Sequence, residues 1–167
     1  GPTTTPPLVD QNKFHAVYLR ANGPCQLDVR SSGQSWGADV HVYADGSEPV
    51  GGRVSLLLHS TSCDNYNALR VERADGLHLR GGSVIDNCGV TPILVSNSVF
   101  TTDPGVTIRN GNRSLVANAV FSAAILLYNS PNFKIVGVHA EDNLATAGQV
   151  GMAGFLVCVG DCTRGTL

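Results

Sequence analysis

Apolar and polar residues alternate in short runs along most of the chain, and Gly, Asn, Asp and Ser separate the runs. Apolar residues rarely recur at the three- or four-residue spacing of an amphipathic helix. Alternation with a period of two places neighbouring side chains on opposite faces of a β-strand. The pattern therefore predicts little helix and many short strands. In the first third these strands are expected near Ala16–Arg20, Gln26–Arg30, Asp39–Tyr43 and Arg53–His59.

From residue 68 onward the alternation becomes an internal repeat. The segment ALRVERADGLHLRGGSVIDN, residues 68–87, aligns without a gap on AILLYNSPNFKIVGVHAEDN, residues 124–143. The two segments begin 56 positions apart, at Ala68 and Ala124, and both end in Asp-Asn. Looser matches inside this spacing join residues 93–98 to 125–130, and residues 105–109 to 76–80.

The spacing of 56 is interpreted as two repeats of about 28 residues, with a further copy beginning at residues 155–157. No repeat of this length can bury its apolar side alone, so the copies are expected to stack on one another. Stacking predicts inward columns of apolar side chains, with the residues between them facing outward. The predicted columns are Leu69, Ile93 and Ile125; Val71, Val95 and Leu127; Leu77, Val106 and Phe133; and Leu79, Ile108 and Ile135.

These columns, together with Asn87, Asn118 and Asn143 stacked at a turn, resemble the right-handed parallel β-helix of the pectin-lyase-like superfamily. The resemblance covers about residues 54–167. It implies an all-β fold in which parallel β-helix coils follow a less regular N-terminal β region, residues 8–53. That region is expected to be either early coils or a cap over the end of the stack. A β-sandwich is the alternative, because short strands with regular turns suit it too.

Composition narrows the classes of partner. A chain of 167 residues fits one domain. Eleven basic and thirteen acidic side chains give a formal charge of -2, which provides no general attraction for nucleic acid. No apolar run approaches the ~18 residues needed to span a bilayer, so membrane insertion is not expected. In residues 1–7, Gly1-Pro2 looks like the scar of a cleaved expression tag, and the following Thr-Thr-Thr-Pro-Pro has the composition of an extracellular linker.

The outward positions of the second strand predict a polar, partly basic stripe of His78, Thr107 and Lys134, beside Arg80 and Arg109. The resemblance implies that such a face binds or cleaves polysaccharide. Two interpretations stay open. The stripe is either an ordinary solvated face or a groove for an acidic glycan, in which the arginines bind anions and Tyr128 supports a sugar ring.

The resemblance also implies two enzymatic routes, a glycosidase with two carboxyl groups about 5 to 10 Å apart and a lyase with calcium-binding carboxylates. Asp86 and Asp142 are expected to stack two coils apart, with Glu141 beside one of them. Asp before Asn at a repeated turn is, however, typical of a turn-stabilising device. The carboxylate cluster of the lyases is missing, so no catalytic residue is assigned.

The five cysteines do not have the spacing of a zinc site, so neither a metal nor a cofactor is predicted. Cys63 and Cys88 lie about one repeat apart. Stacking would bring them within disulfide reach, and buried free thiols are the alternative.

The preferred interpretation is a non-catalytic extracellular recognition module, such as an adhesin, fibre-tip or receptor-binding domain displayed on a cell or virion surface. Its partner would be a glycan or a surface protein, and by analogy with fibres it would form a homotrimer. A polysaccharide lyase or glycosidase fragment acting on an acidic glycan is the first alternative. A structural coat or wall protein is the second.

Overall fold

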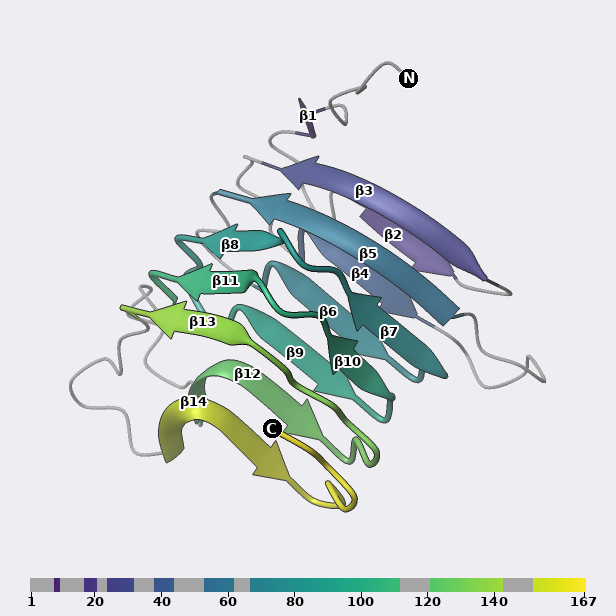
Figure 1. Ribbon diagram of the computed structural model, residues 1–167, viewed down its shortest axis with the longest axis vertical. Coiled ribbons are helices and arrows are strands. Elements are labelled where there is room, and N and C mark those ends of the chain that lie inside the picture. The colour runs from purple at the N-terminus through teal and green to yellow at the C-terminus, as the bar shows by residue number, and fades with distance from the viewer. Residues whose placement is uncertain are drawn as a thin grey trace.

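Two parallel β-sheets face each other and make up the described part of the chain in the computed structural model (Figure 1). The structure describes residues 8–9, 17–20, 24–31, 38–43, 53–61, 67–111, 121–142 and 152–167. All of the regular elements in these ranges are strands, and no helix there could cross a membrane. The all-β prediction is confirmed. Every pairing between the described strands is parallel, which is not the arrangement of an antiparallel β-sandwich.

The eight-stranded sheet lies toward the viewer in Figure 1, and the six-stranded sheet lies behind it. The eight-stranded sheet holds β1 (Leu8–Val9), β3 (Cys25–Ser31), β5 (Arg53–Ser60), β7 (Gly76–Leu79), β8 (Val84–Asp86), β10 (Phe100–Thr102), β11 (Val106–Arg109) and β13 (Val138–Glu141). The six-stranded sheet holds β2 (Val17–Arg20), β4 (Val40–Tyr43), β6 (Leu69–Glu72), β9 (Ile93–Ser96), β12 (Phe121–Tyr128) and β14 (Met152–Val159).

The chain passes back and forth between the two sheets, and one passage through both makes one structural repeat. The sequence left two alternatives for the N-terminal region, early coils or a cap. The strands of residues 17–60 belong to the same two sheets as the later strands. β5 pairs with β3 on one side and with both β7 and β8 on the other. The N-terminal strands and the repeats therefore share one continuous pair of sheets.

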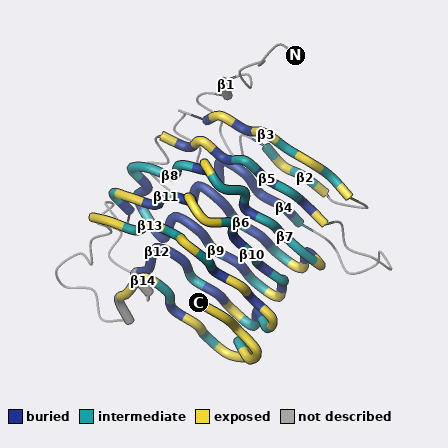
Figure 2. Tube along the Cα trace, viewed as in Figure 1, coloured by how far each residue is buried: buried dark blue, intermediate teal, exposed yellow. Residues whose placement is uncertain are grey.

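Alternation along the strands sorts side chains into the core between the sheets and onto the two outer faces. In β5 the inward Val54, Leu56 and Leu58 are at most 1% exposed. Figure 2 shows the same succession of buried and exposed positions along the stacked strands. Burying each such side chain contributes roughly 1.5–3 kcal/mol. Stacking of repeats thus supplies the core that no single repeat could form.

The two inward columns predicted for the six-stranded sheet are confirmed. Leu69, Ile93 and Ile125 are successive Cα partners and are fully buried. Val71, Val95 and Leu127 form the parallel column beside them. The two repeats measured along these columns are unequal, 24 and then 32 residues, rather than about 28 each.

The two columns predicted for the eight-stranded sheet are buried but wrongly registered. Leu77 pairs with Phe100, not with Val106, and Leu79 pairs with Thr102, not with Ile108. Ile108 instead lies between Ile85 and Ala140. The cause is that each of these repeats carries two strands in this sheet, β7 with β8 and β10 with β11. The alignment matched β11 to β7 and passed over β10.

Turns with positive φ stack at the ends of the strands. Arg73, Asn97, Asn129 and Gly160 have φ of 58°, 50°, 45° and 73° and follow the strands of the six-stranded sheet. Asn tolerates this left-handed conformation better than most residues. The Ser after each Asn is buried and donates its hydroxyl to a backbone carbonyl, as Ser98 does to Ser96 (2.8 Å) and Ser130 to Tyr128 (3.0 Å). The Asn97-Ser98 and Asn129-Ser130 pairs, which recur in the sequence repeat, therefore form the turns that end these strands.

A second stacked turn fixes the register of the eight-stranded sheet. The N–H of Gly82 donates to Gly105, and that of Gly105 donates to Gly137, both at 3.0 Å. Gly137 has φ of 56°, and a Cβ there would lie 2.8 Å from the Cα of Pro104. Only glycine fits this close approach.

Candidate functional site

One outward column of the eight-stranded sheet is polar along its whole described length. Its members are successive Cα partners, and we call them the polar ladder. The polar ladder consists of Gln26, Ser55, His78, Thr101, Lys134 and Thr166. Neighbouring rungs of a parallel sheet lie about 4.8 Å apart. The ladder therefore presents a regular row of hydrogen-bonding groups across several repeats.

Two adjoining hollows lie along this ladder and share His78 and Thr101. The first has a volume of about 410 Å³ and the second about 300 Å³. The first is lined by Arg53, Val54, Ser55, Asp75, Gly76, Leu77, His78, Val99 and Thr101. The second is lined by His78, Thr101, Thr102, Asp103, Pro104, Lys134 and Val136. Together they form a shallow groove with apolar patches and polar walls.

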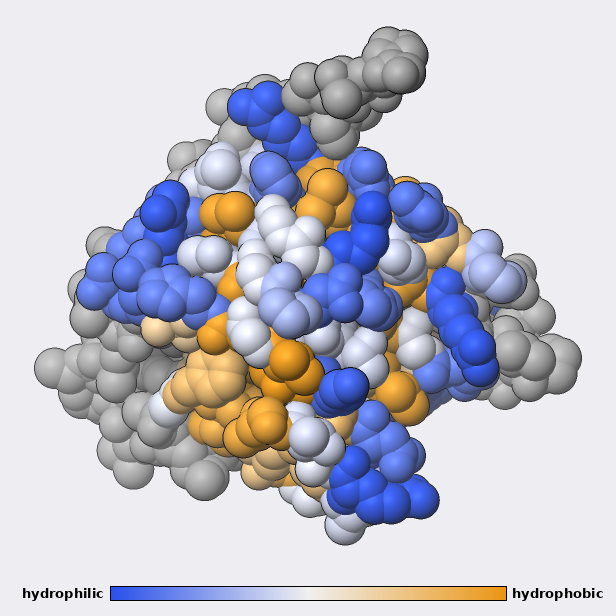
Figure 3. Space-filling model, in the orientation of Figure 1, coloured by the Kyte–Doolittle hydropathy of each residue, from blue (hydrophilic) through white to orange (hydrophobic). Residues whose placement is uncertain are grey.

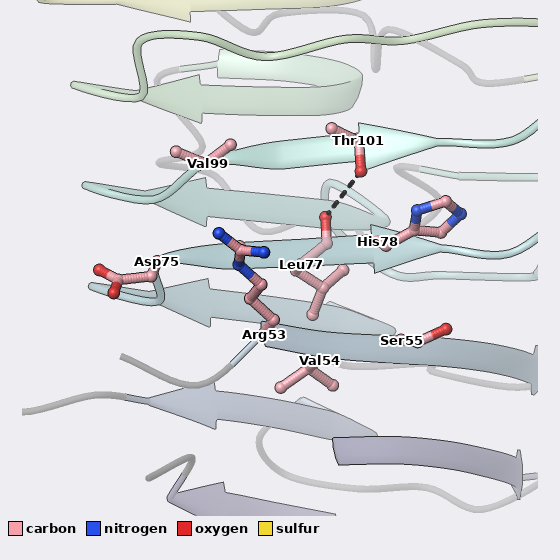
Figure 4. Close-up of a pocket in the computed structure, with 9 residues that line it drawn as sticks. Arg53, Val54, Ser55, Asp75, Leu77, His78, Val99 and Thr101 are labelled. Atoms are coloured by element: carbon pink, nitrogen blue, oxygen red, sulfur yellow. Dashed lines mark hydrogen bonds between the residues drawn. The ribbon is translucent and has the colours of Figure 1, made fainter. Parts of the chain in front are cut away.

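Figure 4 shows how the first hollow is arranged. The guanidinium of Arg53 extends over the hollow near Leu77, with Asp75 at one end and His78 and Ser55 at the other. The Thr101 hydroxyl donates to the Leu77 carbonyl at 3.4 Å. Its oxygen keeps lone pairs that can accept a further hydrogen bond.

Each hollow contains one cation that is not paired. Within the described residues, neither Arg53 in the first hollow nor Lys134 in the second forms an ion pair. Both side chains are exposed. Ser55, two residues after Arg53, lies three strand spacings from Lys134 along the polar ladder, a distance of about 14 Å. The groove thus carries two available positive charges, one toward each end.

His78 stands between the hollows and contacts Asp103. Its Nε2 lies 2.9 Å from Asp103 Oδ2, although the approach does not have the geometry of a hydrogen bond. The contact with His78, opposed by partial desolvation and aided by the Gly81 N–H, holds the pKa of Asp103 below its usual 3.8. Asp103 is therefore an acceptor at neutral pH.

The structure brings together only part of the predicted stripe. His78 and Lys134 share the polar ladder, but Thr107 pairs with Val84 and His139 in another column. Tyr128 is 45% exposed but lies on the outer face of the six-stranded sheet, in register with Ser96. It therefore does not line the groove.

The two predicted anion-binding arginines are engaged elsewhere. Arg80 forms an ion pair with Asp28 and donates to the Leu27 carbonyl at 3.0 Å. Arg109 Nε donates to Asp86 Oδ2 at 2.9 Å. Arg109 thus links neighbouring strands of the sheet, and Arg80 reaches across β5 to β3.

Two of the three carboxylates considered for catalysis, Asp86 and Glu141, lie in a second outward column. We call this column the charged ladder, and it consists of Asp86, Arg109 and Glu141. Asp86 accepts hydrogen bonds on both oxygens, from Arg109 and from Asn110 Nδ2 at 2.7 Å. Arg109 stands between the two carboxylates in the register, so no open cleft separates them as glycoside hydrolysis requires.

The sequence predicted that Asp142 stacks in register with Asp86, and the structure contradicts this prediction. The φ of Asp142, 50°, matches the left-handed turn positions Asn87 and Asn110, at 58° and 53°. The main-chain N–H of Asn110 donates to Glu141, one residue before Asp142. The Asp-Asn pairs therefore align with an offset of one residue, and Asp142 is a turn residue.

The cysteine predictions are tested in part. Cys88 is fully buried and disulfide-bonded. Cys63, Asn118 and Asn143 lie outside the described residues. Cys25, Cys158 and Cys162 are free thiols.

Sequence reasoning missed several residues of the groove, among them Arg53, Ser55, Thr101 and Asp103. Arg53 and Ser55 were read as strand positions, and their outward phase in β5 was the signal that they could join a surface site. Thr101 was missed because β10 is only three residues long and follows a turn.

The described residues contain no group of three or more His, Cys, Asp or Glu side chains that could hold a metal ion. In comparisons with known proteins, no family model, no curated protein and no solved structure matches the chain.

Proposed function

We propose that the chain is a stretch of right-handed parallel β-helix that acts as a non-catalytic extracellular recognition module and binds an acidic glycan along the polar ladder. The observation that carries the proposal is the pair of adjoining hollows, each with one cation, Arg53 or Lys134, that forms no ion pair with the described residues. The passage of the chain between two parallel sheets, with stacked columns and turns, supports the β-helix.

The chemistry of the groove fits a polyhydroxylated, negatively charged polymer. Ser55 and Thr101 offer hydroxyls, Asp103 offers an acceptor, and the cations attract carboxylate or sulfate groups. The apolar side chains of Val99 and Pro104, which are not buried, suit the less polar faces of sugar rings. A row with one polar rung per strand offers repeated contacts to a polymer with a regular repeat.

The disulfide at Cys88 supports an extracellular setting, since disulfides persist mainly in oxidising compartments. The engagement of Asp86 by Arg109 and Asn110 favours binding over catalysis, because both carboxylate oxygens already accept hydrogen bonds.

The test is to titrate the protein with polygalacturonate, heparin and neutral dextran by calorimetry, and to follow new reducing or unsaturated ends in the same samples. We expect saturable binding to an acidic polymer without turnover. Arg53→Ala and Lys134→Ala should each weaken binding roughly ten- to a hundredfold, since a hydrogen bond to a charged group contributes about 1.5–3 kcal/mol.

Arg109→Ala is the matched control, because it removes a cation of the same sheet that is paired with Asp86. It should leave the affinity unchanged. An equal loss in Arg109→Ala and Lys134→Ala would contradict a site on the polar ladder. New chain ends would favour the lyase or glycosidase, and the absence of saturable binding to any polymer would favour a structural protein.

A further inference from the structure

Two cysteines, Cys158 and Cys162, lie in the last repeat, and Cys158 continues a stacked column. The aliphatic column of Val71, Val95 and Leu127 continues to Cys158, the Cα partner of Leu127 in β14. The side chains below it are fully buried, whereas Cys158 is exposed. Figure 3 shows hydrophobic surface gathered where β12 and β14 lie. Cys158 thus occupies a core position at the uncovered end of the described stack.

The Cys162 side chain lies in the turn after β14 and contacts the preceding strand as the turn serine does one repeat earlier. The Ser130 hydroxyl donates to the Tyr128 carbonyl at 3.0 Å and approaches that of Val95 at 3.4 Å, 35 residues earlier. The Cys162 thiol approaches the carbonyls of Val159 and Leu127, each at 3.8 Å, and Leu127 is also 35 residues earlier. The Cys162 thiol therefore makes the same kind of contact to the preceding strand as the turn serine does, from a position one residue further along the turn.

The same turn brings the two thiols together. The Cys162 thiol approaches the carbonyl of Leu127, and Leu127 is in register with Cys158. Gly160, with φ of 73°, reverses the chain between the two cysteines. Burial raises the pKa of Cys158 to about 11, and the charge and contact of Cys162 add to this effect. The thiols are therefore direct neighbours.

We propose that Cys158 and Cys162 are a dithiol that oxidises to a disulfide and fastens the last turn onto β14. The bond would hold the segment that follows, in which Thr163 accepts the N–H of Asn132 and Thr166 pairs with Lys134. Thr166 is the last rung of the polar ladder. The disulfide at Cys88 shows that this fold accommodates oxidised cysteine. The inference does not depend on glycan binding.

The oxidant is a low-molecular-weight disulfide such as oxidised glutathione. The Cys162 thiolate attacks one sulfur of the oxidant, forms a mixed disulfide and releases one glutathione thiolate. Cys158 then loses its proton to that thiolate and displaces the second glutathione. The second glutathione leaves as a thiolate and takes up the proton that Cys162 released when it became a thiolate. Two protein thiols are thus oxidised and one disulfide is reduced to two thiols, so protons and electrons balance.

The test uses the full chain, equilibrated in buffers of defined oxidised-to-reduced glutathione ratio, quenched with N-ethylmaleimide and digested with trypsin. Cleavage after Lys134 and Arg164 releases residues 135–164, which contain these two cysteines and no other. We expect this peptide to lose two hydrogens and to take up no maleimide as the buffer becomes more oxidising. Amide exchange of residues 161–166 should slow several-fold in the oxidised protein.

Cys162→Ser is the matched variant, because a serine hydroxyl is close in size to the thiol and can also donate to the Leu127 carbonyl, so the protein should fold normally. This variant should abolish the slowing of amide exchange, while Cys25→Ser should preserve it. Two alkylated thiols at every buffer ratio would overturn the proposal. So would a stable glutathione adduct on either cysteine, or pairing of either one with Cys25.

Discussion

The polar ladder and the charged ladder run across the same face of one sheet but differ in where their charges go. In the charged ladder, Arg109 bonds Asp86 at 2.9 Å and lies in register between Asp86 and Glu141. In the polar ladder, Lys134 faces a hollow and pairs with no carboxylate of the described residues. One column holds neighbouring repeats together, whereas the other keeps donors available.

The comparison teaches that outward polar residues of a parallel stack cannot be assigned to binding by their type alone. An arginine and an aspartate one rung apart satisfy each other at a separation of one strand spacing. Such a pair gives up the charge that a ligand would need. Availability depends on the neighbour in the column, and that neighbour is far away in the sequence.

The largest effect on stability is expected for a charge placed in the core beneath the sheet that carries both ladders. Ile108→Asp places an unpaired carboxylate in the core under the sheet and should cost several kcal/mol, enough to unfold much of the protein. Thr107→Asp, one residue away and facing outward, should shift stability by no more than about 0.5 kcal/mol. Urea denaturation of the two variants measures the difference. Equal losses would show that the register of β11 is wrong.

Breaking the charged ladder should lower stability without affecting binding. Asp86→Ala removes two hydrogen bonds and leaves Arg109 without its partner, at a cost of about 1–3 kcal/mol. The measurement is the urea midpoint together with the calorimetric affinity for the acidic polymer. A loss of affinity in a folded Asp86→Ala protein would place the ligand on the charged ladder.

A smaller effect is expected for the carboxylate of Asp103, which contacts His78 of the polar ladder. The pKa of Asp103 is lowered in the folded protein, so its contribution to stability is present above its unfolded pKa, near 3.8, and is lost as pH falls through the lower folded value. His78→Gln should move the pKa of Asp103 back toward 3.8. NMR titration of the carboxyl carbon tests this. An unchanged midpoint would assign the shift to the Gly81 N–H instead.

The smallest effect is expected for Arg80→Ala. Its ion pair with Asp28 is partly exposed, and such pairs contribute about 1 kcal/mol or less. Thermal unfolding should change by only a few degrees, and affinity for the acidic polymer should not change. A tenfold loss of affinity would return Arg80 to the binding site.

The interpretation of the six-stranded sheet succeeded because its strands end in a recognisable turn. Asn97-Ser98 and Asn129-Ser130 place a left-handed residue and a buried hydroxyl at the same point of successive repeats. The turn fixed the register, and the columns through Ile93 and Val95 followed from it.

For the eight-stranded sheet, equally clear alternation led to the wrong register. Gly76–Leu79 and Val106–Arg109 have similar alternation, so a match between them looked sound. A slip from one strand to the next preserves the period of two and still buries apolar residues, and the pattern alone cannot detect it. The predicted partner of His78 was therefore Thr107, where the structure has Thr101.

The sequence by itself determined the all-β class, the stacking of repeats and the residues that face the core, because these depend on local alternation and on turn residues with positive φ. Only the tertiary structure decided which outward residues are neighbours. Paired residues on neighbouring strands lie 22 to 33 positions apart because the length of the repeat varies, and local alternation does not reveal that length. The groove of Arg53, His78 and Lys134 arises from that pairing.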